Sequence, residues 1–128
     1  MKENEGIMPV KKILVVDDSP TERHVLGELL TRHGFEVITA DCGERAVELS
    51  REALPDLILM DVVMPGVNGY QATRTIARDP ATRHIPIIMC TSKGQETDRI
   101  WGMRQGAHDY LVKPANPDDL LAKIAALG

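Results

Sequence analysis

The sequence Leu57-Ile58-Leu59-Met60-Asp61 is an unbroken apolar run that ends in a carboxylate. Strands that helices cover on both faces of a parallel sheet have this uniformly apolar character. Ile13-Leu14-Val15-Val16 and Ile85-Pro86-Ile87-Ile88-Met89-Cys90 share it, so all three runs predict buried parallel strands. Glu36-Val37-Ile38-Thr39-Ala40 is less uniformly apolar and fits an edge strand, and Asp109-Tyr110-Leu111-Val112 is the last of five candidates.

The segments between these runs carry apolar residues at helical spacing, which predicts one buried stripe per segment. The stripes are Val25, Leu26, Leu29 and Leu30; Ala46, Val47, Ser50, Ala53 and Leu54; Thr73, Ile76 and Ala77; and Leu120, Leu121 and Ile124. The stretch 95–105 is weaker, but Gly106 offers it a C-terminal stop. Five helices that alternate with five strands predict an α/β fold with a doubly wound parallel sheet.

Length and charge restrict what this chain can do. Its 128 residues suit one domain, which we expect over 12–128 after an N-terminal tail of residues 1–11. The net charge is −4 and no cluster of lysine and arginine occurs, so we expect no direct nucleic-acid binding. No apolar run approaches the roughly 18 residues of a membrane span, which predicts no membrane insertion and a cytoplasmic protein. Cys42 and Cys90 match no metal spacing and are expected to be reduced thiols.

In an open α/β sheet the ligand site forms beyond the carboxyl ends of the strands. Polar residues stand there in this sequence: Asp17 and Asp18, Asp61, Thr91, and Lys113. Acidic residues at a strand-to-helix turn are by themselves usually solvated groups that favour the positive end of a helix. The convergence of all five side chains on one edge of the sheet is what indicates a functional site.

Three carboxylates at one edge repel one another unless a cation lies between them. Magnesium prefers oxygen ligands and typically takes one or two carboxylates plus a phosphate, so Mg²⁺ is the predicted ion. A carboxylate can also act as a nucleophile toward phosphorus when the charge on the transferring group is neutralised. Asp61 is the candidate nucleophile, and the Lys113 ammonium and the Thr91 hydroxyl are candidate ligands of the phosphoryl group.

The sequence resembles the response-regulator receiver domains of two-component signalling over residues 12–127. The motifs that carry the resemblance are 15–19, 59–66, Thr91-Ser92 and Tyr110-Leu111-Val112-Lys113-Pro114, in the family's order and spacing. The resemblance implies a flavodoxin-like sheet with the strand order 2-1-3-4-5. It also implies that a histidine kinase phosphorylates Asp61.

The resemblance assigns further roles to individual residues. Asp18, Asp61 and the carbonyl of Val63 would hold Mg²⁺, with Asp17 assisting. Thr91 and Lys113 would bind the phosphoryl group, so that the domain catalyses its own phosphorylation and dephosphorylation without being a conventional enzyme. Tyr110 would turn inward as Thr91 moves, which would change how a downstream protein binds to the face formed by the fourth helix, the fifth strand and the fifth helix. Lys113-Pro114 is where the family usually has a cis peptide bond.

Residues 17–22, 64–74 and 95–107 resemble the PilH-type regulators of type IV pilus chemosensory systems, which indicates a role in twitching motility. A flagellar chemotaxis regulator is an alternative, although Met60 stands where those proteins typically have an aromatic residue. A pseudo-receiver that only binds partners is a second alternative. It is disfavoured because every expected polar residue is present.

Two local patterns have structural interpretations. Ser19, Pro20 and Glu22 fit a capping box at the start of a helix, so Ser19 and Glu22 are assigned to structure. Trp101 and Met103 fit either ordinary packing or a partner surface.

Overall fold

The structure, a computed structural model, describes residues 9–127. Its centre is a sheet of five parallel strands in the order β2-β1-β3-β4-β5, as predicted. The strands are β1 (Lys12–Val16), β2 (Glu36–Ala40), β3 (Leu57–Met60), β4 (Ile87–Thr91) and β5 (Asp109–Val112). The fourth strand differs from the prediction because it begins at Ile87 rather than Ile85 and includes Thr91. Most of the predicted N-terminal tail, residues 1–8, lies outside the described residues.

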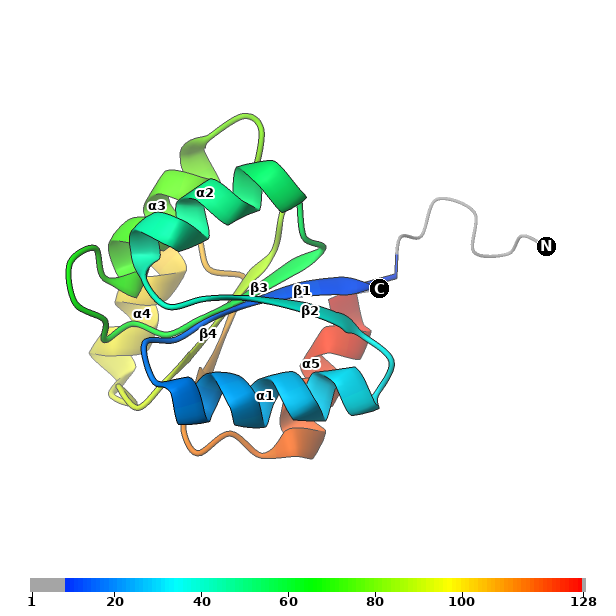
Figure 1. Ribbon diagram of the computed structural model, residues 1–128. Helices are drawn as coiled ribbons and strands as arrows, with labels where there is room; N and C mark the ends of the chain where they lie inside the picture. Colours follow the sequence, from blue (N-terminus) through cyan, green and yellow to red (C-terminus); the bar gives the residue numbers. More distant parts are fainter. Residues whose placement is uncertain (1–8, 128) are drawn as a thin grey trace.

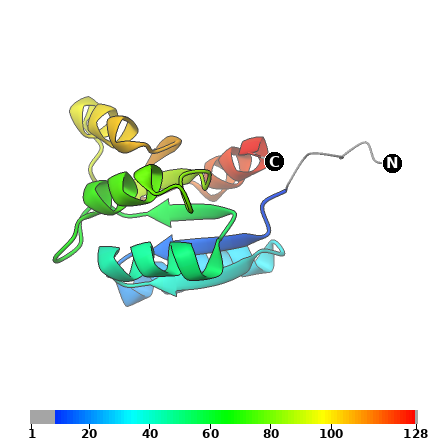
Figure 2. The same ribbon diagram turned by 90° about the horizontal axis from the view of Figure 1, so that it is seen from above.

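Five helices connect the strands and cover the sheet on both sides. They are α1 (Pro20–Arg32), α2 (Gly43–Ala53), α3 (Gly69–Arg78), α4 (Glu96–Gln105) and α5 (Pro117–Leu127). Figure 1 shows α1 and α5 on one face of the sheet and α2 and α3 on the other. Seen from above in Figure 2, α4 lies beyond α3, against which it packs. None of the helices in 9–127 is both long and apolar enough to cross a membrane.

The sheet separates two apolar cores, and the side chains of β1, which point alternately to its two faces, show why. Ile13 and Val15 face the core under α1 and α5, whereas Leu14 and Val16 face the core under α2 and α3. Side chains of a strand alternate between the two faces, so a strand that is covered on both faces must be apolar throughout. This pattern accounts for the unbroken apolar runs. Cys90 is buried in the α1/α5 core, as predicted, and both Cys42 and Cys90 are free thiols.

Two residues of the predicted buried stripes are exposed instead. Val25 is 57% exposed, while Leu26 and Leu30 form the buried edge of α1. Each helical residue turns about 100° from the one before it, so Val25 leaves the narrow stripe that Leu26 and Leu30 define. Leu54 is 51% exposed because α2 has ended at Ala53 and Leu54 takes a left-handed conformation with φ of 46°.

Helix α4 begins and ends as predicted but buries few of its residues. Gln95 is its N-cap, and Gly106 ends it with φ of 118° in the left-handed region. Gly102 is its single buried residue. Trp101 is 49% exposed and Met103 is 36% exposed, so neither is core packing, and a partner surface stays a prediction for both.

Candidate functional site

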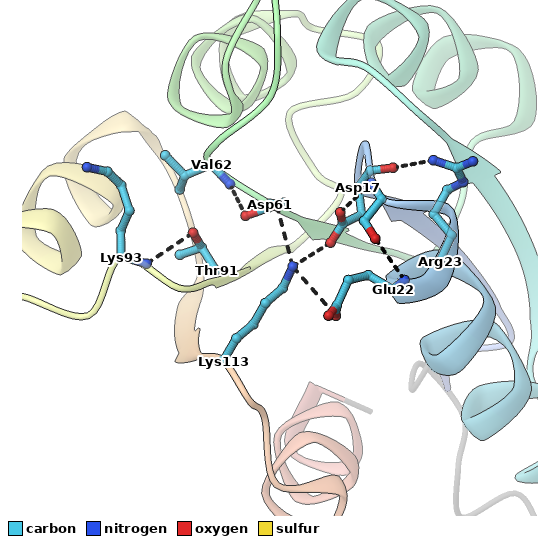
Figure 3. A network of polar contacts seen from close by, with 9 residues as sticks. Asp17, Glu22, Arg23, Asp61, Val62, Thr91, Lys93 and Lys113 are labelled. Atoms are coloured by element: carbon cyan, nitrogen blue, oxygen red, sulfur yellow. Dashed lines mark hydrogen bonds and ion pairs between the residues drawn. The ribbon is translucent and has the colours of Figure 1, made fainter.

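Four of the five predicted polar residues are labelled in Figure 3, where they meet at the carboxyl edge of the sheet, and Asp18 lies beside them. Asp17 and Asp61 directly follow β1 and β3, Thr91 ends β4, and Lys113 follows β5. Backbone hydrogen bonds prolong the parallel ladder through these positions, since Asp61 N donates to Val16 O at 3.0 Å and Lys113 N donates to Thr91 O at 2.8 Å. The sheet itself therefore fixes where these side chains start.

The ammonium group of Lys113 lies among carboxylates. Its Nζ donates to Asp17 Oδ2 at 2.5 Å and to Asp61 Oδ2 at 3.4 Å. Burial by itself lowers the pKa of Lys113, but the hydrogen bond to Asp17 and the charges of Asp61 and Asp17 outweigh burial, and the pKa is raised. Lys113 therefore stays positively charged at neutral pH, within reach of any group attached to Asp61.

Asp61 is a buried carboxylate, only 7% exposed. Burial raises its pKa; the charge of Lys113 opposes this effect and the charge of Asp17 adds to it, so that the pKa lies above its ordinary value. Its Oδ1 accepts a hydrogen bond from Val62 N at 2.7 Å, which leaves Oδ2 facing Lys113. The environment orients one oxygen and keeps the other available for chemistry or for a cation.

Asp17, Asp18 and Asp61 form a carboxylate cluster. One oxygen atom from each lies within 4.8 Å of the others. Asp17 and Asp61 are buried, whereas Asp18 is exposed at the mouth of the site. Oxygen-only ligands with one side open to solvent fit a hard divalent ion that keeps several waters. The Val63 side chain is 55% exposed, and the role of its carbonyl as a ligand stays a prediction.

Gly69 at the start of α3 allows the loop after Asp61 to close tightly. A Cβ atom at Gly69 would lie 2.0 Å from the backbone oxygen of Asp61, a distance that no side chain tolerates. Gly69 N donates to Val62 O at 2.9 Å, and Asn68 and Gln71 form a capping box around the first turn of α3. This close approach of two backbone segments is the structural reason for a glycine at this position.

Thr91 and Tyr110 both connect to the loop that follows β4. Thr91 is fully buried, and its Oγ1 accepts a hydrogen bond from Lys93 N at 3.3 Å. Tyr110 is also buried, and its hydroxyl donates to Lys93 O at 2.7 Å. Burial raises the pKa of the Tyr110 hydroxyl. The Lys113–Pro114 peptide bond is cis, as expected from the resemblance.

The sequence pattern missed contacts that two residues of α1 make with the site. The predicted capping box is only half formed: Ser19 Oγ accepts from Glu22 N at 3.2 Å, but the Glu22 carboxylate lies 3.7 Å from Lys113 Nζ instead of returning to the helix end. Arg23 Nη1 donates to the backbone oxygen of Asp17 at 2.7 Å. A three-residue capping pattern gives no signal for either contact, because both depend on where β5 brings Lys113 and on how the chain turns after β1.

A parallel sheet of this strand order, with a carboxylate cluster and a lysine at its carboxyl edge, defines the receiver class of signalling domains. The chain belongs to the response regulator receiver domain family, whose model matches residues 13–125. It is 52% identical over 116 residues to Protein PilH of Pseudomonas aeruginosa, and the match covers 91% of this chain and 96% of that protein. It is 39% identical to the phosphate regulon transcriptional regulatory protein PhoB of Escherichia coli strain K12, of which it spans 51%.

A solved structure supports the same assignment. The receiver domain of a sensor histidine kinase from Pseudomonas aeruginosa PAO1 superimposes with a TM-score of 0.85 and 32% identity, covering 92% of this chain and 97% of that one. That structure has a magnesium ion coordinated in its active site cleft. This chain is therefore a response regulator of two-component signalling with the receiver fold.

Proposed function

We propose that Asp61 of this response regulator accepts a phosphoryl group from a histidine kinase in a reaction that requires Mg²⁺. The observation that carries the proposal is the pairing of a buried Asp61 carboxylate with Lys113 at one edge of the sheet, beside two further aspartates. A carboxylate nucleophile needs positive charge near the group that it receives. Lys113 is a positive group held within 3.4 Å of Asp61 Oδ2.

We assign the metal site to the carboxylates of Asp18 and Asp61 and the carbonyl of Val63, with Asp17 assisting. The spacing of the carboxylate oxygens, all within 4.8 Å of one another, supports this assignment. When bound, Mg²⁺ neutralises charge on the phosphoryl oxygens. It also relieves the repulsion among the aspartates that burial intensifies.

The chemical step follows from the positions of the protein groups. An oxygen of Asp61 attacks phosphorus, the bond from phosphorus to the imidazole nitrogen of the donor histidine breaks, and that nitrogen keeps the electron pair. Lys113 leaves its contact with Asp17 to pair with a phosphoryl oxygen, and the Thr91 hydroxyl donates to another. Positioning and charge neutralisation supply most of the catalysis in phosphoryl transfer.

The output is proposed to run through Thr91 and Tyr110 to the face made by α4, β5 and α5. Both side chains contact Lys93, which connects them through the loop before α4. The exposed side chains of Ile100, Trp101 and Val112 give that face the apolar and aromatic character of a protein-binding surface. Phosphorylation would bias two existing conformations and so change the affinity of a downstream protein.

The resemblance to PilH-type regulators supports type IV pilus motility as the biological output. A flagellar chemotaxis regulator shares the same fold and chemistry, and a pseudo-receiver would lack the chemistry. Phosphoryl transfer from purified chemosensory kinases separates these possibilities. Preferential phosphorylation by the pilus-associated kinase supports the proposal, preference for the flagellar kinase contradicts the pilus role, and a chain that no donor phosphorylates is a pseudo-receiver.

Incubation of the protein with a small phosphodonor, with and without Mg²⁺, tests the chemistry. Intact mass should show one added phosphoryl group in the wild type with Mg²⁺, and none after chelation or in Asp61→Asn. Asp56→Asn is a matched control, because Asp56 lies at the opposite edge of the sheet, where it accepts hydrogen bonds from the backbone of Lys11 and Lys12. Equal phosphorylation of Asp61→Asn and the wild type would contradict the proposal.

A further inference from the structure

Three carboxylates surround the ammonium group of Lys113, and one of them is neither a predicted metal ligand nor the predicted acceptor. Glu22 Oε1 lies 3.7 Å from Lys113 Nζ, in addition to the contacts with Asp17 and Asp61. Figure 3 shows Glu22 reaching from α1 toward Lys113. The Glu22 side chain is 47% exposed and that of Asp17 only 3%, so Glu22 marks the solvent side of the lysine.

The Glu22 carboxylate is available because the end of the helix does not need it. In a full capping box a glutamate at this position would accept from the N-cap backbone N–H. Here Ser19 N donates to Asp17 Oδ1 at 2.9 Å, which satisfies that donor. Ser19 Oγ still caps the helix by accepting from Glu22 N. Asp17 has therefore replaced Glu22 at the cap, and Glu22 is free to pair with Lys113.

We propose that Glu22 is a positioning residue that holds the Lys113 ammonium toward the mouth of the site and competes with the phosphoryl group for it. The inference rests on the proposed function, in which Lys113 pairs with a phosphoryl group on Asp61. In the unphosphorylated protein, Glu22 draws Lys113 outward and leaves the aspartates more negative. Before Lys113 can pair with a phosphoryl oxygen, it must give up this contact.

Removing the Glu22 charge should change two binding equilibria in opposite directions. Without Glu22, Lys113 sits deeper among Asp17 and Asp61, so their attraction for Mg²⁺ falls. An anionic phosphoryl group binds more tightly, because the Glu22 charge no longer competes with it for Lys113 and no longer repels it. A residue with a purely structural role would weaken both equilibria together.

The expected size of each effect follows from the exposure of the pair. Partly exposed ion pairs contribute little free energy, because solvent screens them. We therefore expect Glu22→Gln to change each dissociation constant by about two- to fivefold. Glutamine keeps the length of the side chain and the backbone N–H that Ser19 caps, so the helix start is preserved.

The experiment uses the full chain as wild type, Glu22→Gln and Glu28→Gln. Glu28 is a matched control because it is exposed on the same helix and pairs with His24 and Arg32, away from the site. The Mg²⁺ dissociation constant is measured by calorimetry, and that of beryllofluoride, a phosphoryl mimic, by fluorine NMR at saturating Mg²⁺. The expected result is weaker Mg²⁺ binding and tighter beryllofluoride binding in Glu22→Gln, with Glu28→Gln unchanged.

Three outcomes would overturn the inference. The first is that both dissociation constants of Glu22→Gln equal those of the wild type. The second is that both constants rise or both fall. The third is that Glu28→Gln shows the same shifts as Glu22→Gln, which would indicate a general charge effect. Failure of the wild type to bind beryllofluoride with Mg²⁺ would instead refute the proposed function. The wild-type measurement therefore separates the two failures.

Discussion

The hydroxyl of Tyr110 on β5 donates a hydrogen bond, 2.7 Å long, to the backbone carbonyl of Lys93 in the loop after β4. The Tyr110 ring is buried against α4, where Gly102 provides the space: a Cβ at Gly102 would lie 3.0 Å from Tyr110 Cε2. On α3, Tyr70 donates to Asp98 O of α4 at 3.1 Å. The position of α4 and the inward position of Tyr110 are therefore coupled by direct contacts.

Replacing Tyr110 by Phe should separate signalling from phosphoryl uptake. The substitution keeps the ring and removes the hydrogen bond to Lys93, which should cost about 1 kcal/mol of unfolding free energy. Because Tyr110 makes no contact with Asp61 or Lys113 among the hydrogen bonds of the described residues, phosphorylation should continue. Urea denaturation, phosphorylation by a small donor and binding of the downstream partner check these points. A normal partner response in Tyr110→Phe and Thr91→Ala would mean that the output takes another path.

Replacing Gly102 by Ala should displace Tyr110 although alanine favours helices. Alanine improves helix propensity by about 1 kcal/mol over glycine. At Gly102, however, the added Cβ would lie 2.9 Å from Met89 Sδ and 3.0 Å from the Tyr110 ring, so Met89, Tyr110 or α4 must move. We expect Gly102→Ala to be no more stable than the wild type and to expose Tyr110, as measured by denaturation and tyrosine fluorescence quenching.

Gly27→Ala on α1 is the control for this substitution. There the added Cβ would meet only Val37 Cγ1 at 3.9 Å, an ordinary contact. This variant should gain up to about 1 kcal/mol. Equal gains at Gly27 and Gly102 would show that the space beside Tyr110 imposes no constraint.

Thr73 carries the single buried side-chain polar atom without a hydrogen-bond partner among the described residues. Replacing Thr73 by Val removes the unsatisfied hydroxyl at nearly constant shape, which should stabilise the protein by about 1 kcal/mol. Thr82→Val is the control for which a loss of stability is expected. Thr82 is also buried, but its Oγ1 donates a hydrogen bond to Ile76 O at 2.8 Å. Chemical denaturation should show a gain for the first variant and a loss for the second. A loss in Thr73→Val would mean that its hydroxyl has a partner in solution.

The raised pKa of Asp61 predicts how stability depends on pH without magnesium. A carboxyl whose pKa is higher in the folded protein loses its proton first in the unfolded chain, so stability falls as pH rises from the ordinary value of about 3.9 through the raised pKa. The Asp61→Asn variant does not show this fall in stability, because asparagine does not ionise. Its stability advantage over the wild type should be small at the acid end of this window, grow across it and then stay constant. An advantage that shrinks with rising pH would contradict the burial effect.

The strands and the polar edge could be predicted from the sequence because each depends on local pattern. Apolar runs such as Leu57–Met60 are uniform only when both faces of a strand are covered, and a polar residue directly after such a run must lie at the sheet edge. Val25 and Leu54 were predicted wrongly because apolar character alone does not fix the width of a helical stripe or the residue at which a helix ends.

The site details that escaped prediction depend on residues far apart in the chain. Glu22 fits a capping box by its spacing, and only the position of Lys113, brought alongside by β5, reveals its other contact. Gly69 fits a turn, and only the return of the loop over Asp61 shows that no side chain could replace its hydrogen. Such contacts are set by tertiary structure, for which the local sequence carries no signal.

Whether Asp61 is the phosphoryl acceptor is decided by mapping the phosphoryl group on the chain. The protein is phosphorylated with a small phosphodonor and Mg²⁺, the acyl phosphate is trapped by reduction with borohydride, and the peptides are sequenced by mass spectrometry. We expect a single reduced residue at position 61, which disappears when Mg²⁺ is chelated. Trapping at Asp17 or Asp18 in the wild type, or phosphorylation that persists after chelation, would contradict it.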